Sequence, residues 1–278
     1  MRWTPGGRSG NLEDRRGGGG IGRGLGIGGT VVILALSLIT GRNLFSDLGV
    51  EPGVGGATAP MSAADSAAEE KEVQFVSFVL DDAQATWSKI MANNGQPYTP
   101  AKLVLFRNST QSACGTGQSA MGPFYCPLDE KMYIDLAFYE DLKKRYGAAG
   151  DFAQAYVLAH ELGHHVQHLT GTDAKVRQMQ QSDPGQANAL SVRMELQADC
   201  YAGVWAASTS QRNMLEPGDV DEAMAAASAV GDDRILAQSG RRVNEESFTH
   251  GSAAQRTEWF KRGYDSGSPR ECNTFATG

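Results

Sequence analysis

The sequence has little positive charge for its size and no visible internal repeat. Its 278 residues include 25 Lys and Arg against 32 Asp and Glu, which gives a net charge of −7. Proteins that bind nucleic acid through their surface normally need a basic face, so we expect no nucleic-acid partner. The length accommodates one sizeable domain together with shorter segments.

Long apolar runs are also absent, with one exception. Residues 24–41 carry no charge over 18 positions, and their centre, 31–39, is almost entirely aliphatic. This run is just long enough to span a bilayer, although its glycines weaken it as a helix. We therefore predict one N-terminal transmembrane helix, an uncleaved anchor, over residues 24–41.

The charges on either side of this run predict its orientation. Residues 1–23 hold five Arg against Glu13 and Asp14, a net charge of +3, whereas acidic residues follow the run. By the positive-inside rule, residues 1–23 are a basic cytoplasmic N-terminus and the long C-terminal part is exported, to the periplasm or an equivalent space. A cleaved signal peptide is the alternative, but Thr-Gly-Arg-Asn at 40–43 is a poor cleavage site.

The remaining chain divides into a polar segment and a folded domain. Residues 42–70 are rich in Gly, Ala, Ser and Pro, so we predict a flexible linker followed by a domain at 71–278. Apolar residues at helical spacing predict a helix from 73 to 90, and apolar, β-branched segments predict strands at 101–107 and 131–136. The rest has mostly helical patterns, so the predicted fold class is α+β, mainly helical.

Cysteine is scarce, with four residues in the chain. Cys114 and Cys126 bracket a loop rich in Gly and Ser, whereas Cys200 lies in a predicted helix and Cys272 near the C-terminus. An even count in an exported domain favours disulfides, although four cysteines allow three pairings. We predict the pairs Cys114–Cys126 and Cys200–Cys272, and the alternative is four free thiols.

Histidine is rare as well, but four of the five His lie within residues 160–168. This stretch begins His-Glu-Leu-Gly-His, and two imidazoles four residues apart on a helix can share one metal ion. The HExxH pattern predicts that His160 and His164 bind zinc and that Glu161 is the general base for a zinc-activated water.

The motif lies in a run that predicts a single well-bounded helix. Asp151 can cap its start, with Gln154 completing a capping box, and Gly171 suits the left-handed residue at its end. The two other His of this helix point away from the ligand pair or lie a turn below it. We expect His165 and His168 to serve packing or to support the ligands rather than to bind metal.

Catalytic zinc usually takes three protein ligands, so one is missing from the motif. The three-His extension of the metzincins fails, because this chain has Gln167 and Thr170 at the required positions. We predict that Glu195, on a helix spanning 186–210, is the third ligand and that Asp199 accepts the other ring N–H of a ligand His. The alternative is a solvated pair of carboxylates on an exposed face.

These motifs together resemble the gluzincin metallopeptidases, the group that contains thermolysin and the HtpX-type membrane proteases. More specifically, the chain resembles the bacterial putative neutral zinc metallopeptidase family. The segments that carry this resemblance span nearly the whole chain: Met1-Arg-Trp3, Tyr133-Ile-Asp-Leu136, His160-Glu-Leu-Gly-His-His-Val-Gln167, Glu195-Leu-Gln-Ala-Asp-Cys-Tyr-Ala-Gly-Val-Trp205 and Phe248-Thr-His-Gly251.

The resemblance implies two further roles within a zincin-like domain. The strand that contains Tyr133, Ile134 and Asp135 would be the edge strand, which holds an extended peptide by main-chain pairing beside the metal. His250 would donate a hydrogen bond to the oxyanion of the tetrahedral intermediate. The alternative for His250 is an ordinary surface histidine.

The function that we expect is a membrane-anchored zinc metallopeptidase that acts on peptides or proteins. One Zn²⁺, held by His160, His164 and Glu195, would be its cofactor, and Glu161 would move the proton from water to the leaving amine. Two alternatives stay open: a zinc amidohydrolase that acts on cell-wall crosslinks, and a tethered, non-catalytic scaffold with a structural zinc. The oligomeric state is left open.

Overall fold

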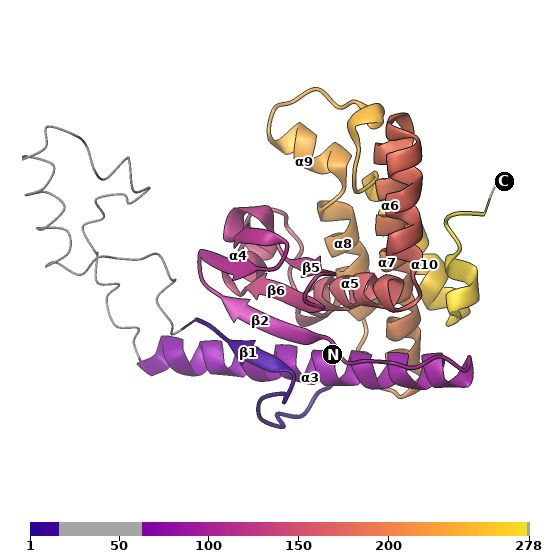
Figure 1. Ribbon diagram of the computed structural model, residues 1–278. Coiled ribbons are helices and arrows are strands. Elements are labelled where there is room, and N and C mark those ends of the chain that lie inside the picture. Colours follow the sequence, from indigo (N-terminus) through magenta and orange to yellow (C-terminus); the bar gives the residue numbers. More distant parts are fainter. Residues whose placement is uncertain (17–62, 277–278) are drawn as a thin grey trace, which may run out of the picture.

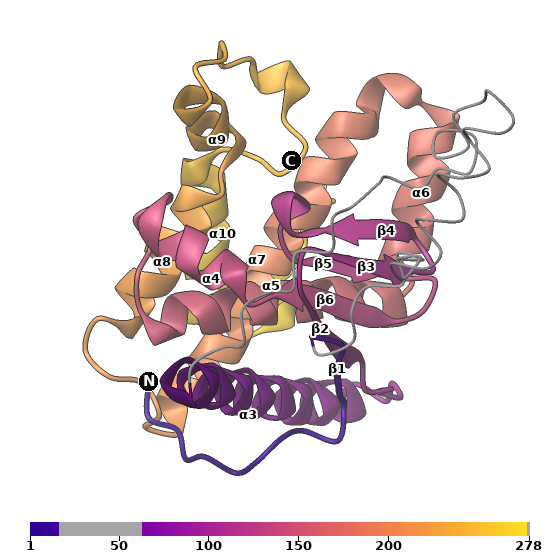
Figure 2. The same cartoon turned by 90° about the vertical axis from the view of Figure 1, so that its left-hand side faces the viewer.

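The computed structural model describes residues 1–16 and 63–276 of the chain. Within them the fold is mainly helical with two small sheets, which confirms the predicted class (Figures 1 and 2). The helices are α3 (Ala63–Asn93), α4 (Ala137–Lys144), α5 (Asp151–Leu169), α6 (Thr172–Ser182), α7 (Ala187–Gln211), α8 (Asp219–Ala229), α9 (Asp232–Gln238) and α10 (Ala253–Ser266). The strands are β1 (Leu12–Asp14), β2 (Lys102–Phe106), β3 (Ser109–Ser112), β4 (Gly115–Gln118), β5 (Phe124–Cys126) and β6 (Lys131–Asp135).

The larger sheet has the strand order β1-β2-β6-β5. β2 pairs in parallel with β1 and β6, whereas β5 pairs antiparallel to β6. Tyr133 of β6 thus faces Val104 on one side and Phe124 on the other. β6 is an internal strand, so the prediction that it offers a free edge to a peptide is wrong. The edge on this side of the sheet belongs to β5.

β5 was not predicted, because it lies at the end of a stretch that has the composition of a loop. Its strand pairing comes from β6, and the Cys114–Cys126 disulfide closes the stretch at the end of β5. The preceding hairpin, β3–β4, packs against it at Gly117, where a Cβ atom would lie 2.5 Å from the Phe124 ring. Tertiary contacts therefore form a strand at the end of a stretch whose overall composition predicts a loop.

Residues 1–16 belong to the same folded body as the rest of the described chain. The Met1 side chain is buried, the Trp3 ring packs edge-on against Phe75, and β1 extends the sheet beside β2. A single membrane crossing at 24–41 would put residues 1–16 and β2 on opposite sides of the membrane. Residues 1–16 are therefore not separate from the folded domain, and the side of the membrane on which they lie stays a prediction.

The predicted linker is also shorter than expected, since α3 begins at Ala63 rather than near 71. Ala and Glu favour helix in this stretch, and Glu69 and Glu70 form ion pairs with Arg16 and Arg8 of the N-terminal segment. In the part of the chain that the structure describes, no helix has the length and apolarity to cross a membrane. The predicted span, 24–41, lies outside the described residues, and membrane attachment stays a prediction.

Small residues let α5, α7 and α10 approach one another closely. A Cβ atom on Gly163 of α5 would lie 3.0 Å from the backbone of Ala198 on α7, and one on Gly203 of α7 would lie 2.1 Å from the Phe260 carbonyl of α10. The small residues of α7 thus leave room for the backbones of both neighbouring helices. The close approach of α5 and α7 brings the side chains of the motif and of Glu195 within reach of each other.

Both predicted disulfides form. Cys114 pairs with Cys126, and Cys200 of α7 pairs with Cys272 in the short 3₁₀ turn Pro269–Cys272. The second bond joins two parts of the chain that are 72 residues apart. It therefore fastens the C-terminal tail to the helix that carries Glu195.

Candidate metal centre

The start of α5 is held by other elements rather than by its own side chains. Gly150 occupies the N-cap and Asp151 is the first helical residue, so the predicted capping box is not formed. Glu222 of α8 instead accepts a hydrogen bond from the Phe152 N–H at 3.1 Å, while Asp151 pairs with the N-terminal ammonium group. The end follows the prediction, with Gly171 in the left-handed region at φ 72°.

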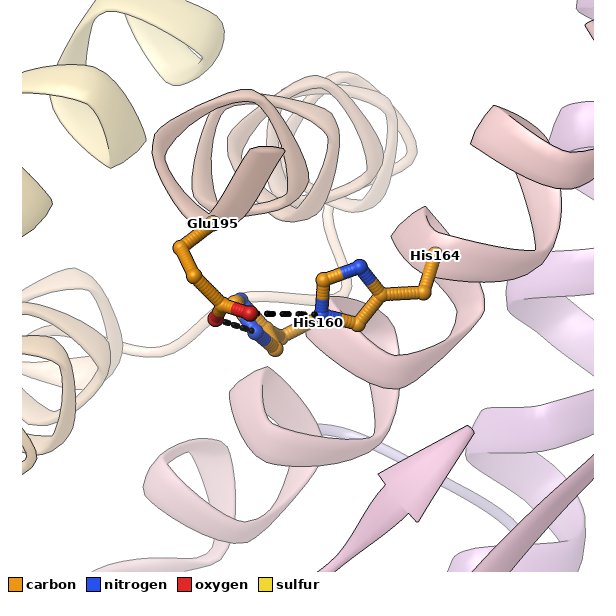
Figure 3. Close-up of side chains that lie close together, drawn as sticks. All are labelled: His160, His164 and Glu195. Carbon is orange, nitrogen blue, oxygen red and sulfur yellow. Dashed lines mark hydrogen bonds and ion pairs between the residues drawn. The ribbon is translucent and has the colours of Figure 1, made fainter. Parts of the chain in front are cut away.

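His160, His164 and Glu195 meet between α5 and α7, as Figure 3 shows. One ligand atom from each residue lies within 4.8 Å of the others. Glu195 Oε2 is 3.1 Å from His160 Nε2, and its Oε1 is 3.5 Å from His164 Nε2. Two imidazole nitrogens and a carboxylate that converge on one point are the donor set of a catalytic zinc site, so these residues fit the predicted ion.

The far side of His160 is held by a buried network. Its Nδ1–H donates to Asp199 Oδ1 at 2.8 Å, which is the contact predicted for Asp199. The hydroxyl of Tyr156 also donates to Asp199 Oδ1, at 2.5 Å, and Arg256 Nε donates to Asp199 Oδ2 at 2.8 Å. The network leaves the Nε2 of His160 to face Glu195.

Sequence reasoning missed Arg256 and Tyr156. The signals were weak but present: Tyr156 lies one turn before His160, and a completely buried Asp199 needs a cation nearby. Burial raises the pKa of Asp199, but attraction to Arg256 and His160 outweighs it, so the pKa lies below its usual value. Asp199 is therefore a carboxylate, and Arg256 neutralises it.

Charge attraction also dominates among the three ligand side chains. Burial lowers the pKa of His160, but Asp199 and Glu195 outweigh this and raise the pKa to about 10. Burial raises the pKa of Glu195, yet His164 and His160 together hold it well below its usual range. Glu195 is therefore ionised, the form in which a carboxylate binds a cation, and the two imidazoles are stabilised in their protonated form.

Glu161 faces the cleft in front of these ligands. Its side chain is almost completely buried, and it has neither an ion pair nor a hydrogen bond with any residue that the structure describes. Burial raises its pKa, although His164 and His160 oppose the effect. A free carboxylate with a raised pKa is a stronger base than an ordinary carboxylate, which suits it to accept a proton.

His250 lies on the wall of the same cleft and is oriented by Asp232 of α9. Its Nδ1 is 3.2 Å from Asp232 Oδ1, and the backbone N–H groups of Thr249, His250 and Gly251 donate to Asp232 Oδ2. The hydrogen bond with Asp232 raises the pKa of His250. The structure thus supplies the orienting group that the sequence did not reveal, and the catalytic role of His250 stays a prediction.

The cleft has a volume of about 650 Å³ and runs past the free edge of the sheet. Its walls include the apolar side chains of Phe124 and Tyr125 from β5 and Phe138 from α4. The predicted substrate-binding residues do not line it. All three are buried in the internal strand β6: Tyr133, Ile134 and Asp135. The Asp135 carboxylate accepts hydrogen bonds from the backbone N–H groups of Asn108 and Ala137, so it is already used within the fold.

The two other His of α5 lie outside the ligand cluster, as expected. His165 is buried between Thr99 O, at 2.7 Å from its Nε2, and the Tyr125 hydroxyl, at 2.9 Å from its Nδ1. His168 pairs with Asp173 of α6 at 2.9 Å. Both anchor α5 to neighbouring segments.

Comparison with known proteins agrees with this site. Residues 1–275 match the family described as "Putative neutral zinc metallopeptidase". The uncharacterized protein YpfJ of Escherichia coli (strain K12) is 47% identical over 284 residues, which cover 99% of each chain. The uncharacterized protein Rv2575 of Mycobacterium tuberculosis (strain H37Rv) is 44% identical over 207 residues, 70% of this chain and 68% of that one. No solved structure matches. The chain belongs to the putative neutral zinc metallopeptidase family.

Proposed function

We propose that the protein is a zinc-dependent peptidase that hydrolyses peptide bonds in peptides or proteins. The observation that carries this proposal is the position of an unpaired Glu161 in the same cleft as His160, His164 and Glu195. A structural zinc site needs no such free carboxylate, so the arrangement favours catalysis over a scaffold role.

The residues of the site divide the chemistry among them. His160, His164 and Glu195 would hold Zn²⁺, which when bound polarises the scissile carbonyl and makes water more acidic. Glu161 accepts a proton as water attacks the carbonyl carbon, and it delivers that proton to the amine as the C–N bond breaks. His250, held by Asp232, donates to the developing oxyanion from the cleft wall.

We propose that an extended substrate pairs with β5 rather than with β6. β5 is the edge of the sheet on this side, and Phe124 and Tyr125 line the cleft that holds Glu161. Main-chain pairing with an edge strand holds a peptide without reading its side chains. The aromatic side chains of Phe124, Tyr125 and Phe138 then favour a substrate with an apolar residue on this side of the cleft.

Two single substitutions test the proposed chemistry. Glu161→Gln keeps the ligands and should retain zinc while losing peptide hydrolysis, whereas His160→Ala should lose the metal itself. Zinc content and cleavage of a fluorogenic peptide library give the two readouts. A Glu161→Gln variant as active as wild type would overturn the general-base role, and cleavage of cell-wall crosslinks but of no peptide would favour the amidohydrolase.

We also propose that the domain works outside the cytoplasm and is attached to the membrane through residues 24–41. Two disulfides support an oxidising compartment. Because residues 1–16 pack on the domain, both should lie on the same side of the membrane. In cells with an intact inner membrane, an impermeant maleimide should label both Thr4→Cys and Lys143→Cys. If Lys143→Cys is labelled but Thr4→Cys is not, the chain crosses the membrane once and the N-terminus is cytoplasmic.

A further inference from the structure

The ligand His164 is held from behind by the side-chain amide of Gln167. The Nδ1–H of His164 donates to Gln167 Oε1 at 2.8 Å, which leaves Nε2 to face Glu195. Gln167 is completely buried on the same helix. The amide oxygen therefore selects the tautomer of His164 that presents a bare Nε2 to a metal.

The orientation of the Gln167 amide is itself determined by two acceptors. Its Nε2 donates to Met194 O at 2.7 Å and to Gln197 Oε1 at 3.1 Å. Both amide protons are used, so only the oxygen remains for His164. Met194 directly precedes Glu195, so Gln167 also ties His164 to the backbone beside the third ligand.

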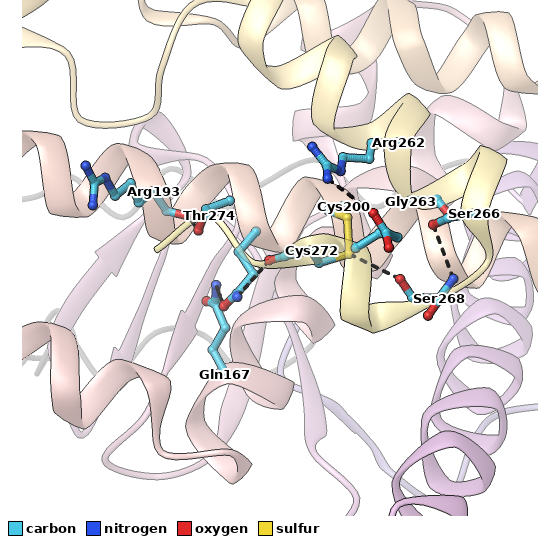
Figure 4. The surroundings of a disulfide bond; sticks show 11 residues. Gln167, Arg193, Cys200, Arg262, Gly263, Ser266, Ser268, Cys272 and Thr274 are labelled. Carbon is cyan, nitrogen blue, oxygen red and sulfur yellow. Dashed lines mark hydrogen bonds and ion pairs between the residues drawn. A yellow bond between two sulfur atoms is a disulfide. The ribbon is translucent and has the colours of Figure 1, made fainter. Parts of the chain in front are cut away.

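Gln197 continues this chain of hydrogen bonds to the C-terminal tail. It is buried on α7, and its Nε2 donates to the carbonyl oxygen of Cys272 at 2.9 Å. The Cys200–Cys272 disulfide holds that carbonyl in place, and Thr274 Oγ1 donates to Arg193 O at 2.7 Å just beyond it (Figure 4). The tail is thus fastened to α7 on both sides of the contact.

The hydrogen bonds that link Cys272, Gln197, Gln167 and His164 all have a defined donor and acceptor, beginning at the Cys272 carbonyl. Cys272 O can only accept, so Gln197 must turn its NH₂ group toward it and its oxygen toward Gln167. If that carbonyl moved away, Gln197 could turn over and present NH₂ to Gln167. Gln167 would then lose one of its two acceptors and keep only Met194 O, so the amide that orients the His164 ring would be held less firmly.

We propose that Gln167 and Gln197 are positioning residues for His164, and that the Cys200–Cys272 disulfide anchors this amide relay. The inference rests on the metal site of the proposed function. It assigns to the disulfide a role in metal affinity in addition to its role in stability. The alternative is that Gln167 and Gln197 only form hydrogen bonds with each other in the protein interior and have no influence on the metal affinity of His164.

Zinc dissociation constants, measured by chelator competition, separate these readings. Gln167→Met should weaken zinc binding by about 10- to 100-fold, and Gln197→Met should weaken it in the same direction but less. Gln84→Met changes a buried glutamine of α3 outside the relay and should leave the constant unchanged. The absorption spectrum of the cobalt-substituted protein should change for the two relay variants only.

Removal of each disulfide in turn tests whether Cys200–Cys272 anchors the relay, with Cys114–Cys126 as the matched control. Cys200→Ala with Cys272→Ala should weaken zinc binding by about tenfold or more, whereas Cys114→Ala with Cys126→Ala should not. Equal zinc affinity in folded Gln167→Met and wild-type protein would overturn the relay. If Gln167→Met does not fold, Gln197→Met and the disulfide pair decide by the same criterion. A wild-type protein that binds no zinc would instead refute the proposed metal site.

Discussion

Arg256 and Asp199 form a buried, bidentate ion pair directly behind His160, one of the proposed metal ligands. Arg256 Nε donates to Asp199 Oδ2 at 2.8 Å, and its Nη2 donates to Oδ1 at 3.0 Å. The two residues lie 57 positions apart, on α10 and α7. The pair lets a full carboxylate orient His160 inside the protein, because Arg256 supplies the charge that water would otherwise compensate.

Removal of the Arg256 cation alone should therefore lower the free energy of unfolding more than removal of both the Arg256 and the Asp199 charge. Arg256→Met leaves Asp199 as a buried anion without its partner and should lower the free energy of unfolding by about 3–5 kcal/mol. The double variant Arg256→Met, Asp199→Asn should recover part of that loss. Urea unfolding of the two proteins measures the difference. Equal stability of the single and the double variant would contradict the role given to Arg256.

The glycine inside the motif should be sensitive to one added methyl group. A Cβ atom at 163 would lie 3.0 Å from the backbone of Ala198, so Gly163→Ala should push α7 away from α5. We expect a loss of about 1–3 kcal/mol in unfolding free energy and weaker zinc binding, since Glu195 lies on the displaced helix. Gly10→Ala is the control, because nothing lies within 4 Å of the added atom there.

Stability should decrease as the pH rises toward neutrality because of Glu72 on α3. Burial, with Glu140 and Glu69 nearby, raises the pKa of Glu72 from its usual value of 4.5 to about 7. Protonated Glu72 therefore adds to the free energy of unfolding. This contribution is fully present below pH 4.5 and is lost as the pH rises through about 7. Glu72→Gln should flatten this decline and should be more stable at pH 8, by on the order of 1–2 kcal/mol after solvent screening.

Urea midpoints between pH 5 and 8 measure this effect. Glu258→Gln, at an exposed position of α10, serves as the control and should follow the wild-type profile. A Glu72→Gln profile parallel to that of wild type would show that this carboxyl ionises without cost in the folded protein.

The packing of the N-terminal segment can be tested at Trp3. Its ring contacts Phe75 at a centroid distance of 5.3 Å and Phe78 at 6.2 Å, both on α3. Trp3→Ala should lower the unfolding free energy by about 1–3 kcal/mol, and Arg2→Ala, at an exposed side chain, by much less. Unchanged stability of Trp3→Ala in the full-length chain would mean that residues 1–16 are not docked in solution.

The ligand set could be predicted because each part of it depends on short spacing. His160 and His164 are four residues apart on one helix, and Glu195 and Asp199 are four residues apart on another. Helical geometry places each pair on one face whatever surrounds it. The structure brings His160, His164 and Glu195 together, with one ligand atom of each within 4.8 Å of the others.

The strand order could not be predicted in the same way. Residues 124–126 end a stretch that has the composition of a loop, and they form a strand by pairing with β6. The wrong choice of edge strand follows directly from that, since β6 ceases to be an edge once β5 is paired. Likewise, Asp151 looked like a helix cap but pairs with the N-terminal ammonium group, 150 positions away.

The sequence by itself determined most of the helices, the pairing of cysteines that we predicted, and the set of His160, His164, Glu195 and Glu161 as the proposed site. Only the tertiary structure decided what stands behind them: Arg256 at Asp199, the amides of Gln167 and Gln197 at His164, and β5 at the cleft. The physical reason is the range of the contacts. Ligand spacing is set within two turns of a helix, whereas buried hydrogen bonds and strand edges depend on which distant segments the fold brings together.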